Sequence, residues 1–320
     1  MQIVILSARR GWHTDELCRA LAERGHIGVV LPYEGLVATI GGPGRASAGL
    51  SSEQAPILTA GAVLARIIPS GSLEQIIYRV DALHWIEDHG VPVMNSPRAI
   101  ERSVDKFYTD ALLHEAGLPT PETVVCETVA AAMEAVRAML GRKGPGDDPA
   151  FDDAVIIKPI FGSMGHGLVR VSDPDVAFRV TKSLDQLRSV FYVQRAVDHG
   201  GRDIRVFVVG GRVIGAIERR APAGEWRTNI ARGGTARAFD LPPDWERLAL
   251  AAAAAMGAEY AGVDLLPSRE GSVFVLEVNA IPGWEGLQRA TGLDVAGTVV
   301  EHLVSRVRTL ALDAAGERRV

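Results

Sequence analysis

Short apolar runs alternate with helically spaced apolar positions over residues 1 to about 100. The strands predicted from these runs cover residues 2–7, 27–31 and 91–94, with another that ends at 67–69. Helices are predicted at 13–24 and after Ser72, which matches a capping box with Gln75. This alternation predicts an α/β unit with a mostly parallel sheet.

The pattern changes after about residue 96. Pro97 is placed as the first residue of a helix, and helical spacing continues through 106–115 before Gly117. Later segments are typical of an α+β fold, with strands and helices at their edges. The strands are expected at 154–159, 168–171, 190–195, 204–209 and 212–220, the helices at 128–140, 243–256 and near 294–311, and a hairpin over 260–279.

Composition and charge exclude several classes of function. The chain has 320 residues and a net charge of −5, so no overall basic field would attract nucleic acid or an anionic membrane. The longest apolar stretch, around 248–256, is far too short for a membrane span, and the first strand has no basic segment before it. Two cysteines, Cys18 and Cys126, do not make a disulfide framework. We therefore expect a cytoplasmic protein with neither nucleic acid nor membrane as a partner.

A carboxylate and an amide stand two residues apart in the apolar run 273–279. Side chains two apart in a strand share a face, so Glu277 and Asn279 direct their oxygens to one side. The hairpin brings Asp264 of the preceding strand beside them. A ligand set of Asp, Glu and Asn oxygens, with no His or Cys, suits a Mg²⁺ ion that also binds the phosphates of a substrate. A hairpin with one solvated face is the alternative interpretation.

A lysine and three glycines suggest a phosphate site. Lys158 ends a strand and is followed by Gly162, Gly165 and Gly167, after which a further strand begins. A Rossmann fingerprint or a P-loop needs a helix at that point, so a glycine-rich hairpin folded over phosphates fits better. Lys158 would reach the α and β phosphates and Lys106 the β or γ side. A simple tight turn is the alternative.

The strand that follows can hold a nucleotide base. Backbone groups of Arg195 and Ala196 could meet an adenine edge, and Asp203 in the next loop could bind a ribose hydroxyl. For Asp203, capping of a turn is the alternative interpretation.

These residues resemble the ATP-grasp superfamily, in particular the RimK-type α-L-glutamate ligases. The matching stretches are 103–106, 157–159 with 162–167, 201–205, 217–220, 226–229 with 231–234, 262–264 and 276–279. Within that family, residues 66–75 and 279–284 look most like the tetrahydromethanopterin:glutamate ligase branch.

The resemblance implies three domains. They are an N-terminal pre-ATP-grasp α/β domain at 1–96, a central ATP-grasp subdomain at 97–190 and a C-terminal ATP-grasp subdomain at 191–320. The two subdomains would clasp ATP between them. The family also allows a homodimer or a homotetramer.

The resemblance also implies roles for individual residues. The nucleotide would be held by Lys106, Lys158, Gly162, Ser163, Gly165, Gly167, Gln194, Arg195, Ala196, Asp203, Arg227, Thr228 and Asn229. One or two Mg²⁺ or Mn²⁺ ions would be held by Asp264, Glu277 and Asn279. The hinge departs from the ribosomal-protein ligase, which has an acidic and an aromatic residue where this chain has Arg195 and Ala196. Adenine contacts through the backbone survive that change.

The implied reaction joins a carboxylate to an amine. ATP phosphorylates an acceptor carboxylate, and the α-amine of L-glutamate attacks the acylphosphate. We expect Arg232 to stabilise the oxyanion and Arg205, Arg219 and Arg220 to bind carboxylates. Strand alternation sends Arg219 and Arg220 to opposite faces, so only one of them would reach the substrate. Trp284 either stacks on a pterin ring or packs in the core.

Three hypotheses follow for the function. The first is addition of glutamate to a tetrahydromethanopterin-type pterin. The second is glutamylation of a protein C-terminus, such as that of a ribosomal protein, or of another coenzyme. The third is a nucleotide-binding regulatory protein without catalysis, against which the intact set of lysines and metal ligands speaks.

Overall fold

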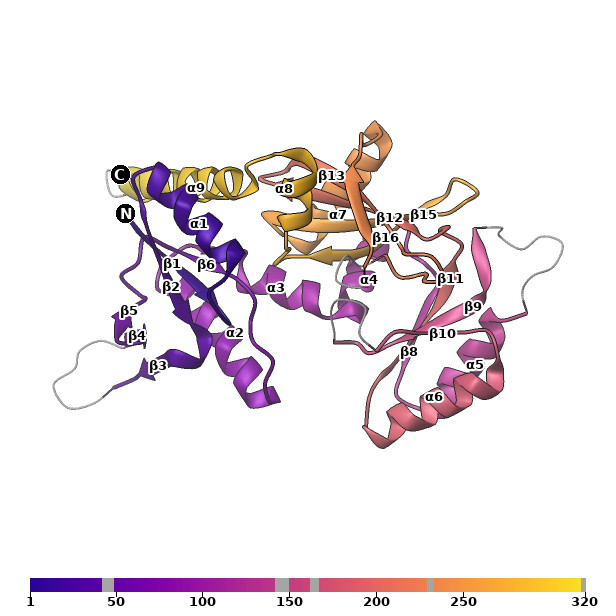
Figure 1. The fold of residues 1–320 in the computed structure, drawn as a ribbon. Helices are drawn as coiled ribbons and strands as arrows, with labels where there is room; N and C mark the ends of the chain where they lie inside the picture. Colours follow the sequence, from indigo (N-terminus) through magenta and orange to yellow (C-terminus); the bar gives the residue numbers. More distant parts are fainter. Residues whose placement is uncertain (42–48, 142–149, 162–166, 229–232, 318–320) are drawn as a thin grey trace.

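The computed structural model describes residues 1–41, 49–141, 150–161, 167–228 and 233–317 (Figure 1). Within these ranges, three larger sheets and one small one carry the fold. A parallel N-terminal sheet followed by antiparallel sheets with helices confirms the fold class predicted from the sequence. No helix within the described ranges is long and apolar enough to cross a membrane.

The N-terminal domain is built on a parallel sheet in the order β2-β1-β6-β7. Its elements are β1 (Gln2–Ser7), α1 (Trp12–Glu23), β2 (Ile27–Pro32), η1 (Tyr33–Gly35), β6 (Ala62–Ala65), α2 (Leu73–Asp88) and β7 (Val93–Met94). A small sheet of β3 (Leu36–Thr39), β4 (Gly49–Ser52) and β5 (Ala55–Pro56) is inserted between β2 and β6. The capping box of Ser72 and Gln75 is confirmed.

One predicted strand was misplaced. The expected strand ending at 67–69 lies instead at Ala62–Ala65, whose four residues are all buried. The strand ends at Ala65, and Ile67 is 56% exposed. The apolar residues at 67 and 68 were therefore not a sign of a buried strand.

The segment after the N-terminal domain contains two helices where the sequence suggested a continuous pattern. They are α3 (Pro97–Val104) and α4 (Lys106–Glu115). Asp105 ends α3 and caps α4, since its side chain accepts a hydrogen bond from the Tyr108 amide at 3.1 Å. The cap gives α4 its own direction and begins it at Lys106.

The central sheet has the order β10-β9-β11-β8 and is antiparallel. Its elements are β8 (Thr123–Cys126), α5 (Val129–Met139), β9 (Phe151–Lys158), β10 (Val169–Val171), α6 (Pro174–Gln186) and β11 (Phe191–Val197). Helices α5 and α6 share an apolar cluster with β9 and β11 and cover one face of this sheet (Figure 1).

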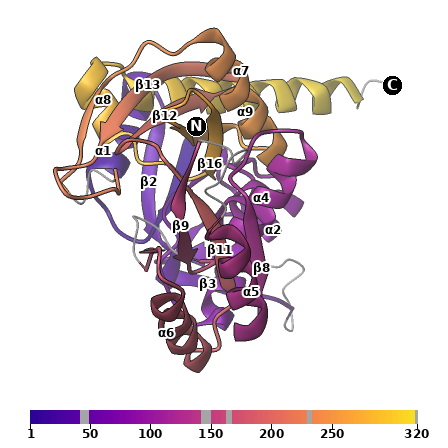
Figure 2. The same cartoon turned by 90° about the vertical axis from the view of Figure 1, so that its right-hand side faces the viewer.

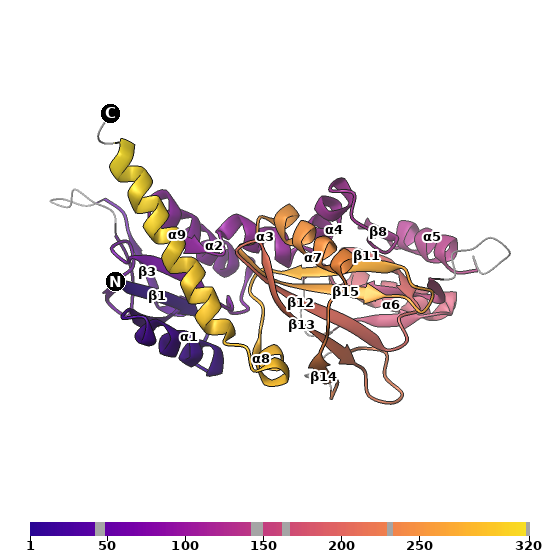
Figure 3. The same ribbon diagram turned by 90° about the horizontal axis from the view of Figure 1, so that it is seen from above.

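The C-terminal sheet has the order β14-β13-β12-β15-β16. Its elements are β12 (Arg202–Val209), β13 (Arg212–Arg220), β14 (Thr235–Ala238), α7 (Pro243–Met256), β15 (Tyr260–Pro267), β16 (Val273–Asn279), α8 (Glu285–Thr291) and α9 (Val295–Glu317). Helix α7 contributes Ala249, Ala252 and Met256 to the core on one face. Helix α9 returns to the N-terminal domain and packs beside α1 (Figures 1 and 3).

Asn95 joins the N-terminal domain to the C-terminal sheet. Its amide nitrogen donates to the carbonyls of Tyr260 and Ala280, both at 2.6 Å, and its oxygen accepts from the amides of Glu259 and Tyr260. The side chain is fully buried. This contact fixes the C-terminal sheet against the first domain, while the central sheet extends to the other side (Figure 1). Figure 2 views the molecule from that side.

Candidate active site

One face of the C-terminal sheet carries most of the charged residues predicted for the site. Asp264 lies opposite Arg205 on one neighbouring strand and opposite Glu277 on the other. Asp203 lies opposite Arg219. Residues opposite each other in an antiparallel pair point to the same face, so these side chains form one polar layer. On β12 and β15 the alternate positions are apolar and belong to the core that contains α7.

Two arginines and two aspartates of this layer form a buried ion network. Arg205 binds Asp264 through Nε and Nη2, at 2.7 Å in each case. Arg219 also binds Asp203 in a bidentate manner, through Nε and Nη2 at 2.7 Å each. Its Nη2 donates to Asp264 as well, at 2.8 Å. Such planar pairs fix the guanidinium direction as well as its distance.

The network determines the charge state of Asp264. Burial alone would raise its pKa, but the charges of Arg205 and Arg219, with their hydrogen bonds, lower the pKa to about 2. Burial likewise opposes the charge of Arg219, yet Asp264 and Asp203 raise the pKa of the guanidinium. Asp264 and Arg219 are therefore both ionised at neutral pH.

The structure places Asp203 differently from the sequence prediction. Both of its carboxylate oxygens accept hydrogen bonds from Arg219, and Thr228 donates to one of them. The side chain is also buried. Asp203 thus holds Arg219 in place and does not offer an open carboxylate to a ribose.

The predicted metal ligands lie together at the end of β16. Asp264 and Glu277 are direct partners across the two strands, and Asn279 follows two residues later on the same face. Across the described ranges, the Glu277 carboxylate has no hydrogen bond or ion pair with the protein. No group of three Asp, Glu, His or Cys side chains converges on one point in these ranges. Both oxygens of Asp264 accept hydrogen bonds from arginines, and Asn279 Oδ1 accepts one from the Ile281 amide at 2.8 Å. The three side chains supply the oxygen ligands that suit Mg²⁺, and a bound ion would compete with these hydrogen bonds at Asp264 and Asn279.

The two predicted phosphate lysines lie near Glu277. Lys158 is buried, with its ammonium 2.6 Å from Gln194 Oε1 and 5.2 Å from the centre of the Tyr192 ring. Lys106 donates to the carbonyl of Ile160 at 3.0 Å. They come from different elements, β9 and α4, and Glu277 acts on the charge of both.

Burial sets the acidity of these lysines. It lowers the pKa of Lys158 to about 8, against the opposing charges of Asp110 and Glu277. The pKa of Lys106 is lowered for the same reason. An incoming phosphate would bring the counter-charge that such desolvated ammonium groups need.

The predicted adenine contacts lie where β11 ends. The Arg195 amide donates to the carbonyl of Glu122 at 2.9 Å, so this N–H is used within the protein. Ala196 lies in the register irregularity between Arg195 and Val197. The Arg195 guanidinium stacks 4.6 Å from the Phe151 ring centre. The Arg195 amide is thus not open to an adenine edge in this structure.

Several predicted residues lie elsewhere or outside the described ranges. Arg220 is on the face opposite Arg219 and pairs with Glu218, so it does not join the polar layer. Arg227 pairs with Glu225 at 2.7 Å. Gly167 has a φ of +75°, which a turn glycine tolerates. The predictions that lie outside the described residues concern Gly162, Ser163, Gly165, Asn229 and Arg232.

Trp284 is a core residue. It is 1% exposed, and its ring lies between His13, at 4.7 Å edge to face, and the Arg66 guanidinium, at 4.7 Å. His13 is itself desolvated, which lowers its pKa to about 4, and its Nε2 accepts the Trp284 amide at 3.1 Å. Of the two interpretations of Trp284, the structure supports packing and not stacking on a pterin.

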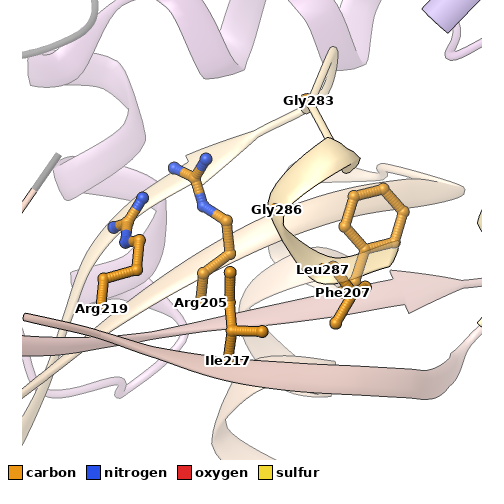
Figure 4. Close-up of a pocket in the computed structure, with 7 residues that line it drawn as sticks. All are labelled: Arg205, Phe207, Ile217, Arg219, Gly283, Gly286 and Leu287. Carbon is orange, nitrogen blue, oxygen red and sulfur yellow. The ribbon is translucent and has the colours of Figure 1, made fainter. Parts of the chain in front are cut away.

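A small pocket opens beside the ion network (Figure 4). It encloses about 40 Å³, room for a few water-sized groups. Its lining residues are Arg205, Arg219, Phe207, Ile217, Leu287, Gly283 and Gly286. Figure 4 shows the two guanidinium groups side by side at one end and the Phe207 ring towards the other. A carboxylate with an adjoining methylene chain matches this division into charged and apolar walls.

Sequence reasoning missed two residues beside Lys106 and Lys158, the pair that we call the lysine wall. Asp110 accepts a hydrogen bond from the Tyr192 hydroxyl, and Tyr192 lies under the Lys158 ammonium. The spacing from Lys106 to Asp110 is four residues, which places both on one face of α4. Tyr192 stands two residues before Gln194 on β11. Both spacings were visible in the sequence.

Comparison with known proteins identifies the family. A model of the RimK-like ATP-grasp domain matches residues 103–303. The tetrahydromethanopterin:α-L-glutamate ligase of Methanosarcina acetivorans is 32% identical over 91% of this chain and 95% of its own length. This chain belongs to the RimK-like ATP-grasp α-L-glutamate ligase family. A protein of Trichodesmium erythraeum named a probable α-L-glutamate ligase is 34% identical over 95% of this chain and 96% of that protein.

Solved structures share the ATP-grasp fold. The D-cycloserine synthetase DcsG has a TM-score of 0.70 at 21% identity and covers 96% of this chain and 100% of its own. The ATP-grasp ligase PsnB, solved with a minimal precursor, Mg and ADP, has a TM-score of 0.69 at 21% identity and covers 96% of this chain and 98% of its own. The family assignment and these folds together make the chain an ATP-grasp ligase.

Proposed function

We propose that this ligase adds L-glutamate to a carboxylate of a tetrahydromethanopterin-type pterin. The observation that carries the reaction type is the convergence of Asp264, Glu277 and Asn279 with a pair of desolvated lysines and an arginine-lined pocket. The acceptor is supported by two relatives of that name, from Methanosarcina acetivorans and Methanococcus maripaludis, each 32% identical to this chain.

The phosphate side of the proposed site rests on Lys158 and Lys106. Their ammonium groups would bind the phosphates of ATP, and the buried position of Lys158 strengthens that attraction because little water screens it. A Mg²⁺ or Mn²⁺ ion held by Asp264, Glu277 and Asn279 would neutralise charge on the transferring phosphoryl group. The acceptor carboxylate attacks the γ-phosphate, which gives an acylphosphate and ADP.

The pocket of Figure 4 would hold the incoming glutamate. Among the described residues, Nη1 of Arg205 and Nη1 of Arg219 have no hydrogen-bond partner, whereas Nε and Nη2 of both are bound to aspartates. The free N–H groups can bind a carboxylate of glutamate, and Phe207, Ile217 and Leu287 would contact its methylenes. The α-amine, held in this way, attacks the acyl carbon and phosphate leaves.

The pterin acceptor can be tested directly. Purified protein would be incubated with ATP, Mg²⁺, L-glutamate and tetrahydromethanopterin, and the products examined by mass spectrometry. We expect a gain of one glutamyl residue that depends on both ATP and glutamate. A peptide ending in the C-terminal sequence of a ribosomal protein serves as the competing acceptor. Extension of the peptide and not of the pterin would overturn the proposed acceptor.

A further inference from the structure

A series of hydrogen bonds links α4 to β11, the strand that carries Gln194. Gln194 is the hydrogen-bond partner of Lys158. The Tyr192 hydroxyl donates to an oxygen of Asp110 on α4 and accepts from Gln194 Nε2 at 3.0 Å. Gln194 also donates to Thr123 Oγ1 at 2.9 Å, and its Oε1 receives the Lys158 ammonium at 2.6 Å. Each of these groups has a defined donor or acceptor role.

Which group donates and which accepts in this series of hydrogen bonds follows from the number of protons that each group carries. A phenol has a single O–H, so Tyr192, having donated to Asp110, must accept from Gln194. Both N–H groups of the Gln194 amide are then used, and its oxygen faces Lys158. Asp110 therefore determines, through Tyr192, which end of Gln194 is presented to the lysine.

The same hydrogen bond connects two parts of the fold. Helix α4 packs on α7 and β16, which belong to the C-terminal sheet, whereas Tyr192 belongs to the central sheet. Asp110 lies one turn after Lys106 on α4. The link from Asp110 to Tyr192 thus sets the position of Lys106 relative to Lys158.

We propose that Asp110 and Tyr192 are positioning residues of the ATP site, which hold Lys106 and Lys158 at the spacing that the phosphates require. They act through the lysines and through Gln194. The inference deepens the proposed function, because it rests on ATP as the ligand of the lysine wall.

The surrounding charges support this role. Four ionisable groups act on the Lys158 ammonium: Asp110 and Lys106 from α4, Glu277 from β16 and the neutral phenol of Tyr192 beneath it. Burial raises the pKa of Asp110, which the Tyr192 hydrogen bond counteracts. The charges of Lys158 and Lys106 also lower the pKa of this half-buried carboxylate, which ties Asp110 electrostatically to both lysines.

Two conservative variants test the proposal. Tyr192→Phe keeps the ring under Lys158 and removes only the bridging hydroxyl, and Asp110→Asn keeps the shape of the carboxylate. Tyr108→Phe on the exposed side of α4 is the matched control. Binding of ATP with Mg²⁺ would be measured by calorimetric titration, and KM for ATP and for glutamate by initial rates.

We expect both variants to bind ATP about tenfold more weakly than wild type. The KM for ATP should rise in proportion while the KM for glutamate stays within about twofold, because the glutamate pocket lies on the other sheet. The double variant should lose no more than the weaker-binding single variant, since both changes break one link. Tyr108→Phe should match wild type.

The results that would overturn the proposal are distinct from failure of the proposed function. ATP affinity within about twofold of wild type in both single variants would contradict it, as would a lower melting temperature with unchanged ATP affinity. Equal increases in KM for ATP and for glutamate would also contradict it. A wild-type protein that binds no ATP would contradict the proposed function itself.

Discussion

The Lys158 ammonium is buried, and burial disfavours its charged form. Its burial lowers its pKa to about 8, from an ordinary value of 10.5, so roughly nine-tenths of it is protonated at pH 7 and one-tenth at pH 9. Because the folded pKa lies below the unfolded value, the folded state binds this proton less tightly. The charge that phosphates need is therefore present below about pH 8 and lost above it.

A pH profile of kcat/KM for ATP should show this titration. We expect the wild-type value to fall as the pH rises through about 8, since kcat/KM reports the free enzyme. Lys158→Arg keeps a positive charge at all these pH values, so its profile, although lower overall, should lack that fall. The same decline in Lys158→Arg would assign the titration to another group.

Glu277 is the second residue on which the site depends. Replacement by Gln keeps the size and removes the charge, so Glu277→Gln should reduce kcat by about a thousandfold or more through loss of the metal. Its melting temperature should stay close to that of wild type, because the carboxylate has no protein partner in the described ranges. Activity near wild type with Mg²⁺ would show that Glu277 is not a metal ligand.

At the scale of elements, two register irregularities bring the charged residues together. Counting from the tight turn at Gly210 and Gly211 places Asp203 opposite Glu218, but the irregularity after Phe207 puts it opposite Arg219. A second irregularity between Asp264 and Leu265 places Asp264 opposite Glu277 and not Leu276. Bulges of this kind add one residue to one strand and reverse its side-chain direction.

These bulges explain how much of the site the sequence could predict. Alternation along β16 was sufficient to place Glu277 and Asn279 on one face, and the apolar runs with a turn predicted the hairpin with Asp264. The pairing of Asp203 with Arg219 depends on a bulge that no local pattern revealed. The ribose role of Asp203 was predicted from its expected place in a loop and from the resemblance. The start of α4 at Lys106 depends on the Asp105 cap, which was equally visible and was not used.

The strand geometry also predicts the role of Arg205. Arg205→Lys retains a charge but loses the planar fork that binds Asp264 and leaves Nη1 for the pocket. We expect the KM for glutamate to rise about tenfold, with a smaller change in the KM for ATP. Arg212→Lys, on the exposed start of β13, is the control and should match wild type. An unchanged KM for glutamate in Arg205→Lys would contradict the pocket assignment.

At the scale of the whole molecule, the N-terminal domain and the C-terminal sheet are held as one body. Asn95 provides four hydrogen bonds across their junction, and α9 crosses back to pack beside α1. These long-range contacts link residues that lie far apart in the sequence. The sequence predicted the elements on both sides of the junction but not this contact, because a single Asn carries no periodic signal.

Asn95→Ala should destabilise the protein. It leaves buried carbonyl and amide groups without partners, which costs about 1–3 kcal/mol for each unsatisfied group. We therefore expect a clear fall in the free energy of unfolding, measured by denaturant titration. Gln186→Ala, at the exposed end of α6, should change it by less than about 0.5 kcal/mol. Equal stabilities of the two variants would show that the junction contributes little.

The central claim is that the site activates a carboxylate by phosphorylation before glutamate attacks. The most direct measurement uses an acceptor whose carboxylate is labelled with ¹⁸O, with ATP, Mg²⁺ and L-glutamate, followed by mass analysis of the released phosphate. If the acylphosphate forms, one labelled oxygen passes to inorganic phosphate for each amide made. Phosphate released without label, while glutamate is joined to the acceptor, would contradict this account.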